Sequence, residues 1–252
     1  MLVAPQQIRD TRAHAEELKF FIDLAVGAGI AEWARARLAA DPHGAGPFLD
    51  EYQVTSLYFD TEHHDVLNGR GSFGRSKYRV RRYGPAEVVF LERKLRRPGL
   101  LHKRRSVTLL DDLGRLGRAD ATDVWPGRWF HRRLVARRLE PVCQLSYHRL
   151  ARVLPTGDGL IRLTLDTDIR VQATSRVAFG AEPGLDILQD QTVLELKYRR
   201  ALPAIFKDLV ERFSLAPTAG SKYRFGMAAL GHRAASPAST PRAAVSRIGG
   251  IA

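Results

Sequence analysis

Charged residues recur at every second position in five runs of the chain that are otherwise rich in strand-forming residues. Arginine offers a planar fork of donors, and lysine a point charge, to the oxygens of a phosphate group. Carboxylates among them could hold a hard divalent cation such as Mg²⁺ or Mn²⁺. The chemistry on offer is therefore the binding of a polyanion together with a metal ion. The five sets are Lys77, Arg79 and Arg81; Glu92 and Lys94; Lys103 and Arg105; Arg162, Thr164 and Asp166; Glu195 and Lys197.

A β-strand directs successive side chains to opposite faces, so each run places its charges on one face and, in most runs, Val, Leu or Ile on the other. Several such strands predict a closed sheet with an apolar outside and a charged inside. The cations outnumber the inward acids, and burying unpaired cations is costly. Surplus positive charge in a narrow channel concentrates its potential, and a linear chain of phosphates fits that potential best. The inward acids are Glu17, Glu92, Asp166 and Glu195.

The composition is compatible with this interpretation. The chain has 252 residues, with 40 Lys and Arg against 27 Asp and Glu and a formal net charge of +13, which favours anionic partners. A single cysteine, Cys143, excludes an internal disulfide. The first residues contain no signal-peptide core, and no run approaches the length of a membrane span. We therefore expect a cytoplasmic protein without a membrane span.

The expected elements alternate between strands and helices without an obvious linker, which predicts one domain. The patterns predict a loose leader over residues 1–12 and a disordered tail over residues 233–252. Helices are expected over residues 29–44, 112–140 and 202–215. Strands are expected over residues 14–24, 52–61, 76–84, 87–95, 102–110, 142–154, 159–171 and 190–199.

The chain resembles the VTC domain, the polyphosphate-polymerase domain of the triphosphate tunnel metalloenzyme (CYTH-like) superfamily. The resemblance covers most of the chain, as a tunnel domain over residues 13–232. Each motif is weak by itself, but nine of them follow the order of the family. They are EELKF, VTSLYFDT, KYRVRRYG, FLERK, KRR, SYHRLA, IRLTLDT, LELKY and SKYRFGM.

The resemblance implies an α+β fold, an antiparallel β-barrel or triphosphate tunnel with helices packed outside it. It also assigns roles residue by residue, without choosing between Lys103 and Arg105 for one basic position. It implies catalytic phosphate clamps at Arg79, Arg81, Lys94, Arg149, Arg162 and Lys222. It implies further phosphate-binding residues at Lys19, Lys77, Lys103, Arg105, Lys197 and Ser221. It implies a Mn²⁺ or Mg²⁺ site at Glu195, helped by Glu17 or Glu92.

The function implied by the resemblance is metal-dependent phosphoryl transfer from ATP to a polyphosphate chain. Two alternatives stay open, and a third is less well supported. A triphosphatase would cleave tripolyphosphate or a nucleoside triphosphate, and a binding module would hold polyphosphate without turnover. Nucleic-acid binding is the weakest, because it calls for cations on an open face with interleaved aromatic residues.

Overall fold

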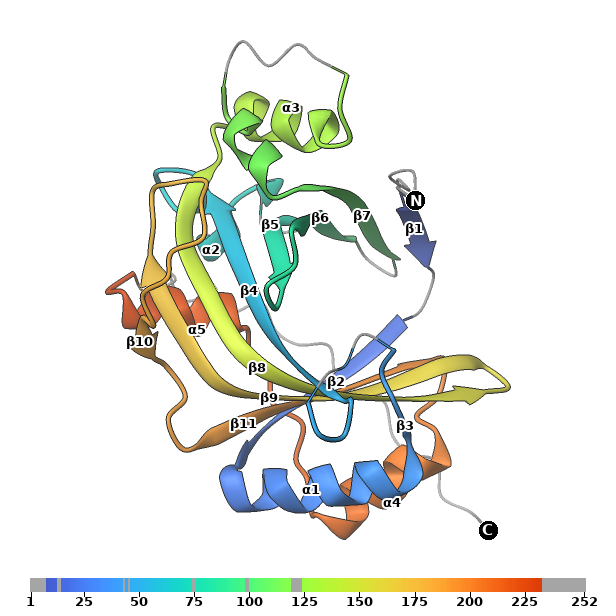
Figure 1. The fold of residues 1–252 in the computed structure, drawn as a ribbon. Coiled ribbons are helices and arrows are strands. Elements are labelled where there is room, and N and C mark those ends of the chain that lie inside the picture. Colours follow the sequence, from blue (N-terminus) through green and yellow to red (C-terminus); the bar gives the residue numbers. More distant parts are fainter. Residues whose placement is uncertain are drawn as a thin grey trace.

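One strongly curved antiparallel sheet forms most of the protein, which a computed structural model describes for residues 8–12, 15–42, 44, 46–73, 76–97, 100–118 and 124–232. Its strands are β1 (Ile8–Arg12), β2 (Ala15–Asp23), β3 (Ala39–Ala40), β4 (Glu51–Asp60), β5 (Ser76–Tyr83), β6 (Val88–Arg97), β7 (Leu100–Leu109), β8 (Glu140–Thr156), β9 (Gly159–Ala173), β10 (Leu185–Asp186) and β11 (Gln191–Arg199). The main order is β1-β7-β6-β5-β4-β8-β9-β11-β2, with β10 on β9 and β3 on β8. The sheet curls into a barrel (Figure 1).

The barrel is not fully closed by main-chain pairing. The two end strands of the sheet, β1 and β2, follow one another in the sequence, yet among the described strands they form no ladder with each other. The expected antiparallel barrel is therefore present, but the expected closed sheet is an incomplete ring. The long strands β8 and β9 bend through both halves of the ring and connect them (Figure 1).

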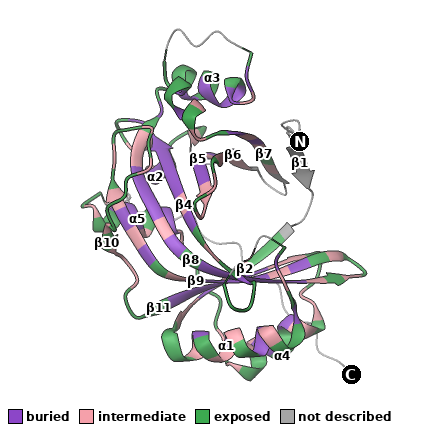
Figure 2. Ribbon diagram, in the orientation of Figure 1, coloured by how far each residue is buried: buried purple, intermediate pink, exposed green. Residues whose placement is uncertain are grey.

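The outer face of the sheet is apolar, as the period-two pattern predicts, and helices cover it. The helices are α1 (Leu24–Arg37), α2 (Asp65–Asn68), the 3₁₀ helix η2 (Asp111–Arg115), α3 (Arg128–Arg137), α4 (Ala204–Arg212) and α5 (Lys222–Ala229). Phe20, Leu163 and Leu194, on the β2–β11–β9 side, pack in one apolar cluster with Ile30 of α1 and Phe206 of α4. Both helices lie beside that part of the sheet (Figures 1 and 2). Leu91 of β6 packs against the apolar side chains of α3. Burying each such side chain contributes about 1.5–3 kcal/mol.

Helix α5 differs from α1, α3 and α4 because it packs on the inner face of the sheet. A Cβ added at Gly226 would lie 2.9 Å from Val171 and 3.1 Å from Leu145. Leu145 lies two residues before the inward-facing Tyr147 on β8 and therefore shares its face. Tyr223 of α5 stacks on Tyr58 with ring centroids 5.1 Å apart. The expected helices outside the barrel are α1, α3 and α4, while α5 fills one end of the barrel.

Three other expectations need correction or lie beyond the described residues. Residues 8–12 are not a loose leader: they form β1, whose main chain satisfies the edge of β7. The helix expected over residues 112–140 is two short helices, η2 and α3. The sequence patterns predict no helix at α5, because its first residues belong to the motif SKYRFGM, to which the resemblance assigns phosphate binding. Residues 1–7 and the tail over 233–252 lie outside the described residues.

Candidate functional site

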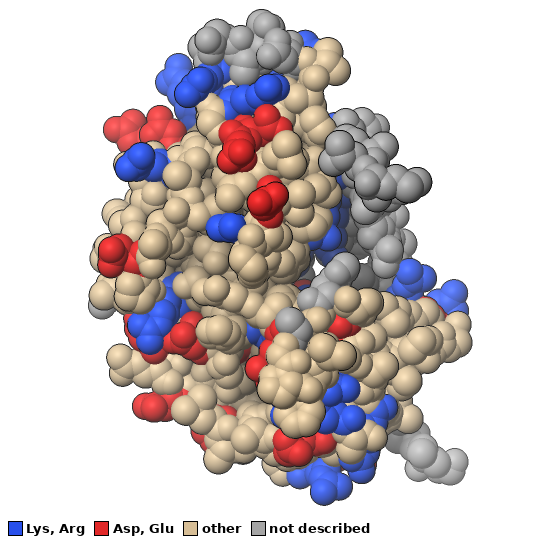
Figure 3. All heavy atoms as spheres, in the orientation of Figure 1, with Lys and Arg blue, Asp and Glu red and all other residues tan. Residues whose placement is uncertain are grey.

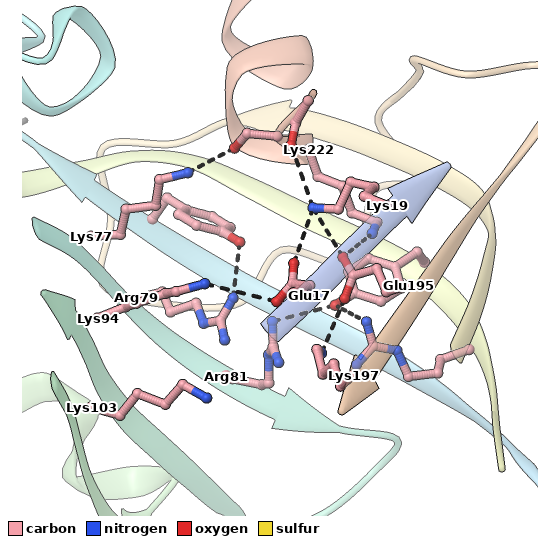
Figure 4. Close-up of a pocket in the computed structure, with 15 residues that line it drawn as sticks. Glu17, Lys19, Lys77, Arg79, Arg81, Lys94, Lys103, Glu195, Lys197 and Lys222 are labelled. Carbon is pink, nitrogen blue, oxygen red and sulfur yellow. Dashed lines mark hydrogen bonds and ion pairs between the residues drawn. The ribbon is translucent and has the colours of Figure 1, made fainter. Parts of the chain in front are cut away.

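A cavity of about 360 Å³ lies inside the barrel, and nine of its fifteen lining residues are Lys or Arg. Figure 4 shows their side chains converging on it from β2, β5, β6, β7 and β11 and from the start of α5. Twelve of the fifteen residues predicted from the sequence line this cavity. They are Glu17, Lys19, Lys77, Arg79, Arg81, Lys94, Lys103, Arg149, Glu195, Lys197, Ser221 and Lys222.

Strand register brings three lysines into one row on one side of the cavity. Lys77 on β5 lies opposite Lys94 on β6, and Lys94 lies opposite Lys103 on β7. Residues directly opposite one another on antiparallel strands share a face, and like charges in such pairs are destabilising. We call Lys77, Lys94 and Lys103 the lysine row, and together with Arg79 and Arg81 they form the cation wall. Such a row favours a ligand that supplies negative charge.

The pKa values of the lysine row reflect this crowding. Burial, followed by Lys94 and Lys19, lowers the pKa of Lys77 to about 8. Burial also lowers the pKa of Lys94; Glu17, 3.9 Å away, opposes that shift, while Arg79 and Lys103 add to it. A bound anion would reverse both effects by stabilising the charged amines.

The opposite side of the cavity carries alternating charges instead. Glu195 on β11 lies opposite Lys19 on β2, and Lys197 lies opposite Glu17. Lys19 Nζ is 3.2 Å from Glu195 Oε1, and Lys197 Nζ is 3.1 Å from Glu195 Oε2. Although burial would raise the pKa of Glu195, Lys197, Lys222 and Lys19 hold it well below its usual value. We call this side, Glu17, Lys19, Arg149, Glu195, Lys197 and Lys222, the paired wall.

A fully buried carboxylate, Asp166, supports the paired wall from behind. Arg149 donates to it with Nε at 2.6 Å and Nη2 at 2.7 Å, and Lys222 Nζ lies 2.6 Å away. Burial would lower the pKa of Lys222, but Asp166 and Glu195 outweigh it and raise that pKa. Asp166 does not line the cavity and serves to hold two cations at its wall.

Three predicted residues do not line the cavity. Arg162 is turned to Asp41 at 3.0 Å and to the Tyr52 hydroxyl at 2.6 Å. Glu92 accepts from Arg79 Nε at 2.6 Å and lies 3.2 Å from Arg105 Nε. Although burial would raise the pKa of Glu92, Arg79, Arg81 and Arg105 lower it to about 2. Of Lys103 and Arg105, Lys103 lines the cavity, whereas Arg105 lies over the Phe90 ring and pairs with Glu92.

Three lining residues were missed by the sequence prediction: Tyr58, Tyr147 and Gly220. The Tyr147 hydroxyl accepts from Arg81 Nη2 at 3.3 Å and from Arg149 Nη2 at 3.4 Å. The Tyr58 hydroxyl accepts from Arg79 Nη1 at 3.3 Å. Tyr147 stands two residues before Arg149, so period-two counting extended to aromatic residues could have found it. The two tyrosines hold the arginine side chains in place.

Two carboxylates in the cavity could hold a metal ion. Glu17 and Glu195 both line it. Although burial and the negative charge of Glu195 would raise the pKa of Glu17, nearby lysines lower it, and the effect of Glu195 indicates that the two carboxylates are neighbours. Among the described residues, no group of three or more His, Cys, Asp or Glu side chains is arranged to hold a metal. Two carboxylates fit Mg²⁺ or Mn²⁺, which are commonly held by one or two carboxylates together with substrate phosphates and water. Glu92, committed to two arginines, does not fit this role.

The fold of this chain, an incomplete antiparallel barrel, is similar to that of a group of solved structures. One is a candidate adenylate cyclase from Bacillus halodurans, with a TM-score of 0.50 and 14% identity, covering 82% of this chain and 94% of that one. Another is a candidate adenylyl cyclase from Hippeastrum for which a dominant triphosphatase activity is described. Its TM-score is 0.46 at 13% identity, covering 86% of this chain and 96% of that one.

The sequence itself places the chain more closely. The VTC domain matches residues 14–231, so this chain belongs to the VTC domain family. No protein with a curated description matches it. None of the helices in the described part of the chain combines the length and the apolar composition needed to cross a membrane.

Proposed function

We propose that the cavity binds a linear phosphate chain and transfers the terminal phosphoryl group of ATP to a growing polyphosphate. The observation that carries the proposal is the lysine row. Three lysines placed directly opposite one another destabilise the empty protein, and the phosphates of a linear chain would neutralise all three at once. Membership of the VTC domain family supports the same conclusion.

Catalysis of this kind depends on positioning and on charge stabilisation, with little covalent chemistry for the protein to perform. Arg79 and Arg81 would clamp non-bridging oxygens from the cation wall, while Arg149 and Lys222 would do so from the paired wall. Lys94 and Lys103 would extend the track for the rest of the chain. Arg162 is left out of this set, because its guanidinium is bonded to Asp41 and Tyr52.

Glu17 and Glu195 would hold the Mn²⁺ or Mg²⁺ ion, whose contribution when bound is to neutralise charge on the phosphate oxygens. These carboxylates are now shared with Lys19, Lys197 and Lys222. With these carboxylates holding the ion, Lys19 and Lys197 would be available to contact phosphates, while Lys222 would keep its contact with Asp166. The paired wall would then become a second phosphate-binding surface.

The distribution of charge argues against a nucleic-acid function. On the face of the molecule in Figure 3, Lys and Arg lie in separate groups with Asp and Glu between them. Nine of the eleven cations that the sequence analysis singled out line the cavity inside the barrel instead. Nucleic-acid binding calls for cations on an open face.

One assay tests the proposal and separates its alternatives. Purified protein is incubated with γ-labelled ATP and Mn²⁺, and the products are resolved by chain length against free phosphate. Lengthening chains are the expected result. Free phosphate alone would favour a triphosphatase, and tight tripolyphosphate binding without turnover would favour a binding module. The Glu195→Gln variant is the control, since an enzyme should lose turnover in this variant, whereas a binding module should still bind tripolyphosphate. A protein that shows no turnover and no binding would refute the proposal.

A further inference from the structure

Ser221 occupies an unusual position at the start of α5. It is the N-cap residue of that helix, a position where serine normally accepts a hydrogen bond from a main-chain N–H of the first turn. Its side chain makes no such bond. The Ser221 Oγ instead accepts from Lys77 Nζ, on the opposite wall, at 2.8 Å. The hydroxyl is therefore turned into the cavity, where its side chain is half-buried.

Three residues of the cavity lining carry hydroxyl groups, and the two that are tyrosines accept hydrogen bonds from arginines. The Tyr58 hydroxyl accepts from Arg79, and its ring stacks on Tyr223. The Tyr147 hydroxyl accepts from both Arg81 and Arg149. Ser221 is the one aliphatic alcohol in the described lining, and an amine rather than a guanidinium is bonded to it. It is the best-placed protein nucleophile in the cavity.

The amine bonded to Ser221 is also the one best suited to accept a proton. Lys19 lies 3.2 Å from Glu195, and Lys222 lies 2.6 Å from Asp166, so both amines already have carboxylate partners. Within the described residues, Lys77 has no carboxylate partner, and burial beside Lys94 and Lys19 brings its pKa to about 8. A lysine lowered to this range by burial and neighbouring cations can act as a general base. Bound phosphate raises this pKa again, so the neutral amine that a general base requires becomes more abundant as the pH rises.

We propose that Ser221 is itself a phosphoryl acceptor, with the neutral amine of Lys77 as its general base. The proposal rests on the proposed function, since it uses the same donor in the same cavity. Ser221 Oγ attacks the terminal phosphorus of ATP or of a polyphosphate, and its proton passes to Lys77 Nζ. The new O–P bond forms as the bridging P–O bond breaks, and that electron pair leaves with ADP or with the shortened chain. The product is phosphoserine.

A phosphoserine at this point would give the cavity a fixed acceptor. Its non-bridging oxygens would lie at the start of α5, between Lys19, Lys77 and Lys222 (Figure 4). A second phosphoryl group could then be added to it, so that a chain begins on the protein. This identifies a first acceptor for the synthesis proposed above.

The experiment measures whether the protein gains the mass of a phosphoryl group and which peptide carries it. The purified chain is mixed with saturating ATP, or separately with tripolyphosphate, in the presence of Mn²⁺, stopped with acid within the first turnover, and mapped by peptide mass spectrometry. We expect a gain of one phosphoryl group at Ser221, absent from Ser221→Ala and slowed at least about tenfold in Lys77→Gln. Ser76→Ala removes the neighbouring hydroxyl on the outer face of β5 and should leave the gain unchanged.

Calorimetry with tripolyphosphate keeps the two proposals apart. A protein that binds tripolyphosphate, or turns it over, while Ser221 stays unmodified would overturn this inference and leave the proposed function standing. A gain at Ser221 that Lys77→Gln does not slow, with binding saturated, would overturn the role of Lys77 as base. A wild-type protein that does not bind tripolyphosphate would overturn the proposed function and this inference with it.

Discussion

The two walls of the cavity use the same residue types with opposite electrostatic results. On the cation wall, Lys77 faces Lys94, and burial beside other cations lowers the pKa of Lys77 to about 8. On the paired wall, Lys222 contacts Asp166 and Glu195, and its pKa is raised. The charge of Lys222 is therefore stabilised by carboxylates on the paired wall, whereas the charge of Lys77 is destabilised by neighbouring cations on the cation wall. The difference indicates that the charges of the paired wall are matched within the protein, whereas those of the cation wall favour an anionic ligand.

The largest expected effect comes from removing the arginines of the cation wall. Arg79→Ala combined with Arg81→Ala should lower turnover at least about 1,000-fold, because preorganised charge on the transferring phosphoryl group is lost. The barrel should stay folded, since Glu92 keeps Arg105 as a partner. Turnover of labelled ATP and far-ultraviolet circular dichroism measure the two outcomes. Retained turnover would show that the cavity is not the reaction site.

The next experiment tests the comparison on the stability of the two walls. Lys222→Met leaves the buried Asp166 with Arg149 alone and should lower the free energy of unfolding by about 3–5 kcal/mol. Lys77→Met removes a cation that is already destabilised and should raise that free energy. Urea unfolding without ligand measures both. If both variants were equally destabilised, the distinction between the walls would be wrong.

Ligand binding should test Lys77 of the lysine row directly. Lys77→Met should weaken tripolyphosphate binding about 10–100-fold, since a charge-assisted hydrogen bond to phosphate is lost. Lys207→Met, on the exposed side of α4, is a matched control that should bind normally. Calorimetry at constant salt gives the comparison. Equal affinity in wild type and Lys77→Met would remove the lysine row from the binding surface.

A pH series should reveal the titration of Lys77. The charged amine is the form that binds phosphate, so affinity for tripolyphosphate should fall by up to about tenfold per pH unit as the pH rises through 8. Stability without ligand should move the other way. Between pH 8 and about 10.4 the unfolded chain holds more protons at this lysine than the folded one, so this group makes stability rise with pH. The Lys77→Met variant should lose both trends.

The smallest expected effect concerns a supporting tyrosine. Tyr58→Phe removes the hydroxyl that accepts from Arg79 and should weaken tripolyphosphate binding by about 1 kcal/mol, while the stack on Tyr223 stays. Tyr78→Phe, on the outer face of β5, removes a buried hydroxyl away from the cavity and provides the comparison. A larger loss in Tyr78→Phe would indicate that general destabilisation, not Arg79, explains the effect.

Period-two counting determined from sequence which side chains face inward. Lys77, Arg79 and Arg81 share a face whatever their partner strands, because alternation is a local property of an extended chain. The surplus of cations, and with it the preference for a polyanion, follows from composition and needs no coordinates. The VTC motifs supplied most of the remaining site residues by resemblance.

Only the tertiary structure decided how those charges are matched. Whether a lysine faces Lys94 or Glu195 depends on strand order and register, which join segments more than a hundred residues apart, as in β2 and β11. The same non-local pairing turned Arg162 toward Asp41 and placed Ser221 beside Lys77. Local alternation fixes the face of a side chain, while the sum of distant main-chain pairings fixes its neighbours. The neighbours set the pKa values, and so they separate the wall with surplus positive charge from the wall whose charges are paired.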